Sequence, residues 1–219
     1  MNRVEMEHAG TRALHEFWVK LRAGRAAPYR AEVTAAGLGA ALFAQIAVLE
    51  QIGPGDYRIR LAGPELHEVF GLEIRGMSFE SLIEHESRRA LLSLADEALA
   101  QGAVAVARIE GRAPGAPMVE MELILAPLRS DFGRVDRLLA AVHAFGLEES
   151  GRIARAPRRC HLLRAALEPA GVADPAEPLP GFAEGAAPFT MDRPSLASFA
   201  GDGDGKGERR RDHLRLVKD

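Results

Sequence analysis

The chain has 219 residues, of which 47% are hydrophobic and 27% are charged, and its formal net charge at pH 7 is -3. This composition is typical of one or two globular domains and excludes a fibrous or wholly disordered protein. The small net charge gives no strong field to attract nucleic acid or an anionic membrane. We therefore expect neither as a partner.

Cys160 is the only cysteine, which excludes an internal disulfide and a cysteine-based metal site. The first residues lack the apolar region of a signal peptide. The most apolar stretch, residues 35–49, is shorter than the ~20 residues that span a bilayer. We expect a cytoplasmic protein without a membrane segment.

Composition changes near residue 147. Large apolar residues (Val, Ile, Leu, Met, Phe, Trp, Tyr) number 50 in residues 1–147 and 14 in the remaining 72, which hold seven of the 13 prolines. We predict a folded domain over 1–147 and a low-complexity, largely disordered tail over 148–219 that adds little stability. Two pieces of this tail have the pattern of ordered structure: a helix over 158–167, and residues 213–217, which are able to pair with a sheet edge.

The first predicted element is an amphipathic helix that is capped by Thr11 and ends near Gly24. Four large apolar residues share one face of it: Leu14, Phe17, Trp18 and Leu21. Two interpretations of this face carry equal weight. It either binds a partner or covers the open side of its own domain.

Apolar periodicity predicts the remaining elements. Strands are expected over 44–52, 56–62, 103–110 and 118–125, and helices over 64–70, 79–84 and 86–101. Residues 135–145 fit both patterns, with a slight preference for helix. This order predicts an α+β fold, in which helices gather on one face of an antiparallel sheet.

The order resembles the PAS sensor-domain superfamily, which has two strands, short helices, a longer helix and three strands. The chain is also similar to a bacterial PAS subfamily that opens with Trp-x-x-Leu-Arg-x-Gly-Arg-x-x-Pro. The matching residues here are Trp18, Leu21, Arg22, Gly24, Arg25 and Pro28. The resemblance covers about residues 11–147 and implies that 135–145 is a fifth strand, which gives a PAS-like five-stranded sheet.

No group of residues predicts catalysis or a metal site, because none of the seven histidines has a close metal-ligand spacing. An enzyme remains a third alternative. It requires His143 or His85 to form an acid–base pair with a nearby glutamate.

We predict no cofactor. The PAS resemblance makes haem the alternative, with His85 as the candidate iron ligand and His67 as a weaker one. PAS-like light sensors carry a flavin-reactive cysteine in an Asn-Cys-Arg motif, whereas Cys160 lies in the predicted tail. The resemblance therefore gives no support for flavin photochemistry.

One apolar cluster is a candidate site for a small apolar ligand, although such clusters are more often filled cores. Its members are Phe70, Met77, Phe79, Leu82, Ile83, Leu91, Met121 and Leu123.

The resemblance implies a non-catalytic sensory or regulatory domain that acts in signal transduction by binding a ligand or a partner. Residues 148–219 are too few and too polar for a kinase or cyclase. The signal is therefore expected to leave through a protein partner or a homodimer. The alternative is a constitutive PAS-fold scaffold or dimerisation module with a filled core and no ligand.

The purified protein is expected to be colourless, because the sequence predicts neither a flavin-reactive cysteine nor a matched haem site. A visible absorption scan checks this. A Soret band that disappears in His85→Ala would contradict it.

Overall fold

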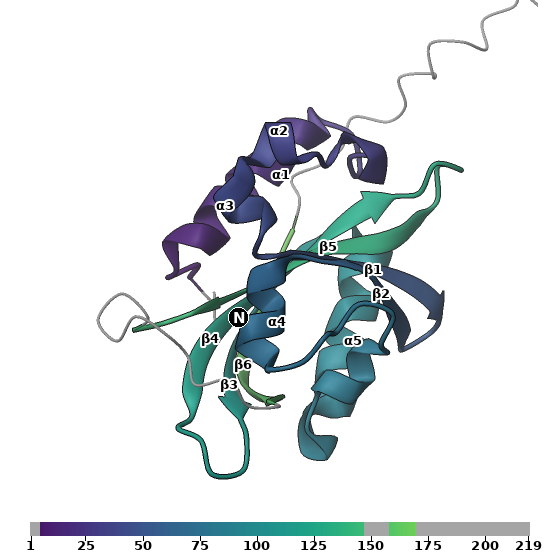
Figure 1. Ribbon diagram of the computed structural model, residues 1–219. Helices are drawn as coiled ribbons and strands as arrows, with labels where there is room; N and C mark the ends of the chain where they lie inside the picture. The colour runs from purple at the N-terminus through teal and green to yellow at the C-terminus, as the bar shows by residue number, and fades with distance from the viewer. Residues whose placement is uncertain (1–4, 147–157, 170–219) are drawn as a thin grey trace, which may run out of the picture. The chain divides into compact units, whose positions relative to one another are not determined.

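The computed structural model describes residues 5–146 and 158–169, which form a six-stranded antiparallel sheet with helices packed on it (Figure 1). By its internal contacts the chain divides into two units, Met1–Ala176 and Glu177–Asp219. All of the described residues belong to the first unit, and the predicted segment 213–217 lies outside them.

The strands are β1 (Ile46–Gly53), β2 (Asp56–Ala62), β3 (Val104–Arg112), β4 (Val119–Arg129), β5 (Val135–Ala144) and β6 (Arg159–Glu168). The helices are α1 (Ala9–Arg22), α2 (Ala35–Leu38), α3 (Ala40–Phe43), α4 (Pro64–Phe70) and α5 (His85–Gln101), with short 3₁₀ turns η1 (Arg30–Glu32) and η2 (Phe79–Leu82). The sequence predicted no element for α2 or α3.

The strand order is β2-β1-β5-β4-β3-β6, and every neighbouring pair is antiparallel. The α+β antiparallel fold is therefore confirmed. Residues 135–145, whose periodicity slightly favoured a helix, form β5 in the middle of the sheet. Pairing with β1 on one side and β4 on the other satisfies its backbone groups, which outweighs the local pattern.

Helices cover both faces of the sheet: α4, η2 and α5 lie together on one face, as predicted, and the N-terminal amphipathic helix α1 covers the other. We call the face that packs against α4, η2 and α5 the inner face, and the face that packs against α1 the outer face. Along β5, Leu138 and Ala140 point inward while Leu139 and Ala141 point outward. Apolar side chains on both faces need cover, and Figure 1 shows α1, α2 and α3 on the side opposite α5.

Helix α1 begins at a different residue from the one predicted. His8 is its N-cap and accepts a hydrogen bond at Nδ1 from the backbone N–H of Gly10 (3.0 Å), whereas Thr11 lies inside the helix and is fully buried. At the other end, the guanidinium of Arg25 donates to the carbonyl oxygens of Leu21 (2.6 Å) and Arg22 (3.0 Å). These two bonds satisfy carbonyls that the end of the helix leaves open.

The prediction of a helix over 158–167 is wrong, because these residues form β6 on the free edge of β3. Alanine, leucine and arginine favour a helix locally. In the folded chain the whole length of β3 offers a hydrogen-bonding ladder, and the segment pairs with it from Arg159 to Glu168. The domain predicted to end at 147 therefore receives a sixth strand from the predicted tail.

Bonds to the helical layer hold the first part of β6. The N–H of Arg158 donates to the carbonyl of Phe70 (3.2 Å), and the N–H of Glu84 donates to the carbonyl of Cys160 (2.9 Å). The N–H of Leu162 donates to the hydroxyl of Ser87 (2.9 Å). The strand is thus attached to α4 and α5 as well as to β3.

No helix within residues 5–146 and 158–169 combines the length and apolar content needed to cross a membrane.

A chain that ends at Ser150 lacks β6 and is expected to unfold at least about 8 °C below a chain that ends at Ala176, because the edge of β3 becomes exposed. Thermal unfolding followed by circular dichroism measures the difference. Equal unfolding midpoints for the two chains would show that β6 adds little stability and behaves as part of a tail.

Candidate functional site

The eight residues predicted to bind an apolar ligand lie together in the core beneath the inner face. Met77 is partly buried and packs against this core, while the other seven are at most 7% exposed. The members come from α4, η2, α5, β4 and the loops beside them. The structure thus brings the predicted set together as tightly packed core residues. Their binding of a ligand stays a prediction.

The apolar face of α1 packs against the outer face of its own sheet. Leu14 and Trp18 are 0% and 1% exposed, and Phe17 is partly buried against the same cluster. The indole N–H of Trp18 donates to the carbonyl of Pro127 on β4 (2.7 Å). Of the two interpretations of this face, the packing agrees with the one in which α1 covers its own domain. A partner has access to Leu14 and Trp18 only if α1 moves.

A cluster of buried polar side chains that was not predicted from the sequence lies under the N-terminal end of α1. We call it the outer polar cluster. It consists of Arg108 on β3, Glu122 on β4 and His143 on β5, which contact Glu7 and His8 at the start of α1. All three strand residues are at most 4% exposed. Burial of this kind is stabilising only if the groups are paired.

Glu122 holds the chain just before α1. Its two carboxylate oxygens accept the backbone N–H groups of Glu7 (2.9 Å) and His8 (3.0 Å). The side chain is 0% exposed. A carboxylate that accepts two N–H groups in this way is a strong, charge-assisted anchor for the segment.

Arg108 neutralises the acidic groups around it. Its guanidinium forms an ion pair with Glu7 and lies 3.4 Å from the carboxylate of Glu120. It also stacks 3.9 Å from the centre of the Phe145 ring. The hydrogen bond from Arg108 holds the pKa of Glu7 below its ordinary value. Arg164 on β6 adds a second ion pair to Glu7 at 2.6 Å.

His143 is held neutral in this cluster. Burial, aided by the neighbouring His8, lowers its pKa to about 4, although Glu122 acts in the opposite direction. Its ring stacks on His8 with 4.8 Å between ring centres and 3° between planes. A Cβ on Gly10 would lie 2.6 Å from Cε1 of His143, so α1 approaches this closely only because residue 10 is glycine.

The outer polar cluster does not provide an acid–base site. His143 lies directly across from Glu122 in the β4–β5 register, which is the pairing that the enzyme alternative requires. Both carboxylate oxygens already accept backbone N–H groups, and neither residue is more than 3% exposed. A substrate therefore has no access to the pair.

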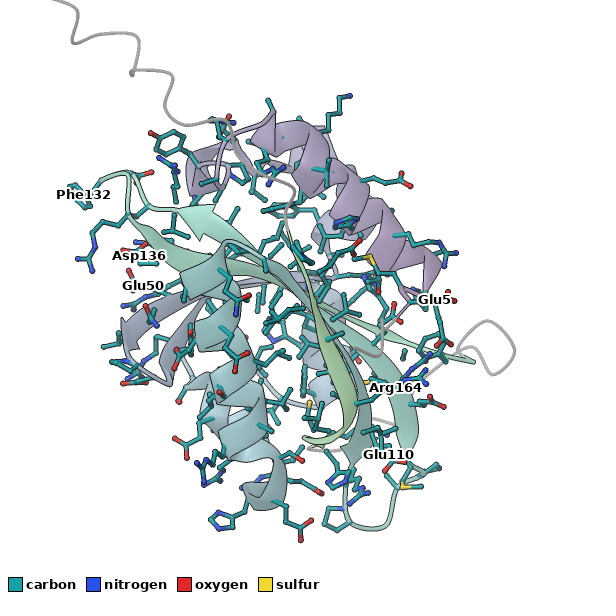
Figure 2. All side chains as sticks on the ribbon, turned by 180° about the vertical axis from the view of Figure 1, so that it is seen from behind. Glu5, Glu50, Glu110, Phe132, Asp136 and Arg164 are labelled. Carbon is teal, nitrogen blue, oxygen red and sulfur yellow. The ribbon has the colours of Figure 1, made fainter. Side chains whose placement is uncertain are left out.

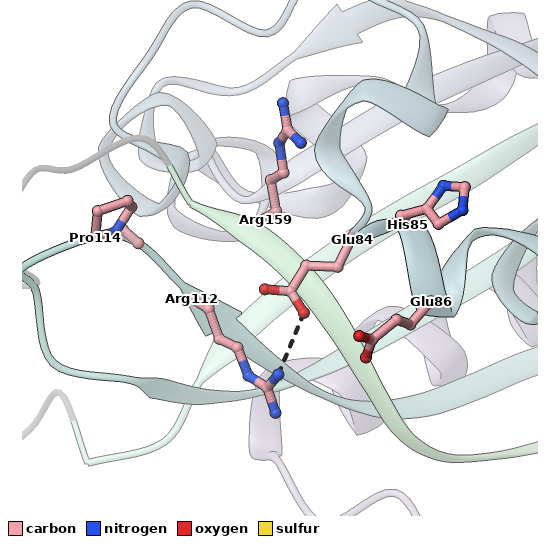
Figure 3. Close-up of a pocket in the computed structure, with 7 residues that line it drawn as sticks. Glu84, His85, Glu86, Arg112, Pro114 and Arg159 are labelled. Atoms are coloured by element: carbon pink, nitrogen blue, oxygen red, sulfur yellow. Dashed lines mark hydrogen bonds and ion pairs between the residues drawn. The ribbon is translucent and has the colours of Figure 1, made fainter.

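An open cleft of about 730 Å³ lies at the N-terminal end of α5 (Figure 3). Arg112 in this cleft forms ion pairs with Glu84 (3.3 Å) and Glu110 (2.7 Å). Acidic and basic groups thus alternate, and the cleft presents no single charge to a ligand. Its lining residues are Glu84, His85, Glu86, Arg112, Ala113, Pro114 and Arg159.

The two histidines considered for haem lie on α4 and at the start of α5. His85 is exposed at the start of α5, and in Figure 3 its ring projects away from Arg112. His67 accepts the N–H of Ile74 at Nδ1 (3.2 Å) and lies 3.7 Å from Glu73. Within residues 5–146 and 158–169, no three His, Cys, Asp or Glu side chains converge as metal ligands.

Strand alternation contained a signal for the outer polar cluster. Arg108, Glu122 and His143 interrupt apolar runs, and each has the same parity as the outward residues of its strand, such as Val106, Ile124 and Ala141. A charged residue on a buried face implies a partner above it. The strand pairing, which places these three residues beside one another, was not available from the sequence.

Comparisons with solved structures find distant similarities. A LOV protein of Rhodobacter sphaeroides is 15% identical, with a TM-score of 0.40; the match covers 49% of this chain and 62% of that one. An RNA-binding light-oxygen-voltage receptor is 21% identical over 53% and 35% of the two chains, with a TM-score of 0.38. A sensory box histidine kinase/response regulator of Burkholderia thailandensis is 11% identical over 54% and 89%, with a TM-score of 0.35.

No curated protein matches the chain. The chain spans less than two thirds of the Rhodobacter protein, so that protein's activity does not transfer with the match. The family model described as PAS domain matches residues 6–143, which run from the segment before α1 to the end of β5. On this match, and with the sheet and helices described above, the chain belongs to the PAS domain family.

Proposed function

We propose that this PAS domain is a non-catalytic sensory or regulatory domain that signals through protein contacts, with α1 as the element that changes position. The observation that carries the proposal is the outer polar cluster. A helix that only covers a sheet needs an apolar face, and α1 already has one in Leu14 and Trp18. The cluster adds an attachment whose strength depends on charge.

The two parts of the attachment respond differently to a change of conditions. Apolar packing of Leu14 and Trp18 is largely insensitive to pH and charge. At the N-terminal end, the side chains of Glu122 and Arg108 are desolvated. Their hydrogen bonds and ion pair to Glu7 and His8 form only while this segment is docked. Loss of these partners leaves the buried Glu122 and Arg108 without their charge-assisted hydrogen bonds, which favours two discrete positions of this end of α1, docked and released.

Release of α1 exposes the surface that a partner binds. Leu14, Phe17, Trp18 and Leu21 form a stripe at helical spacing, the pattern that docks into apolar grooves of other proteins. On this proposal the stripe has two alternative partners, its own sheet and a second protein. The competition between them is the signal.

The alternative is a constitutive scaffold, and the packing of the inner core favours it. The residues proposed to bind a small apolar ligand are core residues with little exposure. Mass spectrometry of the denatured, purified protein distinguishes the two, since a sensor occupied by a ligand releases a small molecule. Met77 and Met121 are the residues whose flexible side chains best adapt to such a guest.

The test of α1 release is Gly10→Ala in the full chain. In an ordinary helix this change stabilises by up to about 1 kcal/mol. Here the added Cβ meets the ring of His143 at 2.6 Å, so we expect the N-terminal end of α1 to detach and the rest of the helix to leave the sheet with it. Trp18 is the only tryptophan, and its fluorescence should shift to the red and become accessible to acrylamide.

The matched control is Ala13→Gly, which weakens the helix at an exposed position without touching His143. Trp18 should stay buried in this variant. Light scattering should find larger assemblies for Gly10→Ala, and adding Phe17→Glu should abolish them. A buried Trp18 in Gly10→Ala, or exposure without association, would support the constitutive scaffold instead.

The stability of the domain should fall as the pH falls from about 6.5 to about 4. The pKa of His143 is lowered to about 4 in the folded chain. As the pH falls below 6.5, His143 is therefore protonated in the unfolded chain before it is protonated in the folded chain, and this favours unfolding. The loss is on the order of 3 kcal/mol, complete near pH 4 and absent above pH 6.5.

Urea unfolding between pH 4 and pH 8 measures this dependence, with His143→Gln as the control. The variant keeps a polar side chain that does not titrate. Its stability should vary less across this range than that of the natural chain. The same slope in both chains would assign the pH dependence to other groups.

A further inference from the structure

A phenylalanine stands almost fully exposed at the tip of the hairpin that joins β4 to β5. Phe132 is 92% exposed and belongs to neither apolar cluster of the domain. Turn positions favour Gly, Asn, Asp or Ser, so neither turn chemistry nor the core accounts for an aromatic residue here. Aromatic side chains are enriched at the centres of protein interfaces. Phe132 is therefore a candidate anchor for another protein surface.

Backbone hydrogen bonds hold this tip in one conformation. The N–H of Ser130 donates to the carbonyl of Arg134 (2.8 Å), and the N–H of Gly133 donates to the carbonyl of Ser130 (2.9 Å). Gly133 has a φ of 79°, which glycine adopts without strain. Because the tip is already ordered, presenting Phe132 to a second surface costs little conformational entropy.

Side chains of opposite charge flank the anchor. Asp131 and Arg134 are both exposed. In the part of the chain that the structure describes, neither side chain forms an ion pair. The tip thus presents one apolar group between one free carboxylate and one free guanidinium.

The cleft at the N-terminal end of α5 has complementary features. Ala113 and Pro114 give it an apolar wall. Arg112 already has two carboxylate partners, which leaves Glu86 and Arg159 as lining charges that form no ion pair with residues 5–146 and 158–169. Figure 3 shows Pro114, Arg159 and Glu86 on different sides of the ion pair in the cleft. The cleft therefore offers an apolar surface between free charges of opposite sign.

The tip and the cleft lie at opposite ends of β4. Residues 112–114 of the cleft come before this strand, and the tip follows it directly. The 11 residues of β4 span about 35 Å at ~3.3 Å per residue. In Figure 2, Phe132 lies at the far end of the domain from Glu110, which pairs with Arg112 of the cleft. Phe132 therefore does not reach the cleft of its own chain.

We propose that copies of this chain associate head to tail, with the β4–β5 tip of one copy inserted into the cleft of the next. Phe132 packs on the apolar wall of the cleft. Arg134 lies against Glu86, and Asp131 lies against Arg159. Each free charge of the tip thus meets a free charge of opposite sign, as complementary interfaces require.

A cleft suits the anchor better than a second tip does. Side chains that dominate an interface fill well-packed pockets, and two tips that meet offer Phe132 no concave surface. The cleft, at about 730 Å³, has room for the ring and the residues beside it. We therefore favour the contact between tip and cleft over a symmetric contact between two tips.

A contact between two different surfaces does not close on itself. Each added copy presents a new free tip and a new free cleft, so association continues beyond the dimer. The contact does not involve α1 and so goes beyond the proposed function. Phe132→Ser leaves α1 intact and Phe17→Glu leaves the tip intact, so the two proposals fail separately.

One hairpin tip in one cleft gives a small interface, so association should be weak and dependent on concentration. Sedimentation velocity of the full chain between about 5 and 200 µM tests this. We expect the average sedimentation coefficient to rise without a plateau at the dimer value. A monomer at every concentration, or a plateau at the dimer, would overturn the inference.

Two variants that each lose one half of the contact give a sharper test. Phe132→Ser removes the anchor and keeps the cleft, whereas Glu86→Arg combined with Arg159→Glu reverses the charges of the cleft and keeps the tip. Each variant alone should weaken association at least about tenfold. An equimolar mixture should form dimers and nothing larger, because one intact tip then meets one intact cleft.

The matched control is Leu163→Ser, which removes an exposed apolar side chain outside both surfaces and should leave association unchanged. The fluorescence of the buried Trp18 checks that each variant is folded. Natural association in either contact variant, or a mixture that stays monomeric while the natural chain associates, would contradict this contact.

Hydrogen exchange of the natural chain gives a second readout that needs no variant. Protection of the amides of residues 131–133 and 113–116 should increase with protein concentration. Protection of the β1–β2 turn, residues 53–55, should not change. Protection of the tip and the cleft loop that is independent of concentration would overturn the inference.

Discussion

Burial of the central strands on both faces is the constraint on which the rest of this structure depends. Every residue of β4 from 121 to 128 is buried, and so is β5 from Leu138 onward. A sheet buried on one face needs one layer of helices, whereas this sheet needs two. Helices α4 and α5 supply the inner layer, and α1 with the short α2 and α3 supplies the outer one.

On the outer face of the sheet, polar side chains are buried together with apolar ones, and their desolvation is unfavourable. Arg108, Glu122 and His143 occupy buried positions on the outer face, and such groups are costly unless they are paired. The segment before α1 supplies partners for them: the ion-pairing carboxylate of Glu7, two backbone N–H groups and the ring of His8. The buried groups therefore have these partners only when α1 is docked. In the function proposed above, this coupling makes the position of α1 sensitive to charge.

The motif with Trp18, Arg22 and Arg25 has a mechanical role at the opposite end of α1. Trp18 bonds to the carbonyl of Pro127, and Arg22 lies 5.4 Å above its ring. Arg25 satisfies the last carbonyls of the helix and pairs with Glu32 at 2.9 Å, while Arg129 donates its N–H to the carbonyl of Pro28. The C-terminal end of α1 thus has contacts of its own with the domain, and release of the whole helix breaks them together with the outer polar cluster.

The sequence by itself determined the elements that have strong periodicity and clear ends. Helix α4 and strand β2 match their predicted residues, and α5 differs by one, because Pro64, the strict alternation of 56–62 and Gly102 are local signals. The apolar residues that the sequence singled out lie together in the inner core, because helical periodicity and strand alternation identify the buried faces of their elements. The tertiary structure decided the states of β5 and β6 and brought the outer polar cluster together. Strand pairing can override helix propensity in β6, and it alone sets Arg108, Glu122 and His143 side by side, because these residues come from three strands whose order in the sheet is not written in any local pattern.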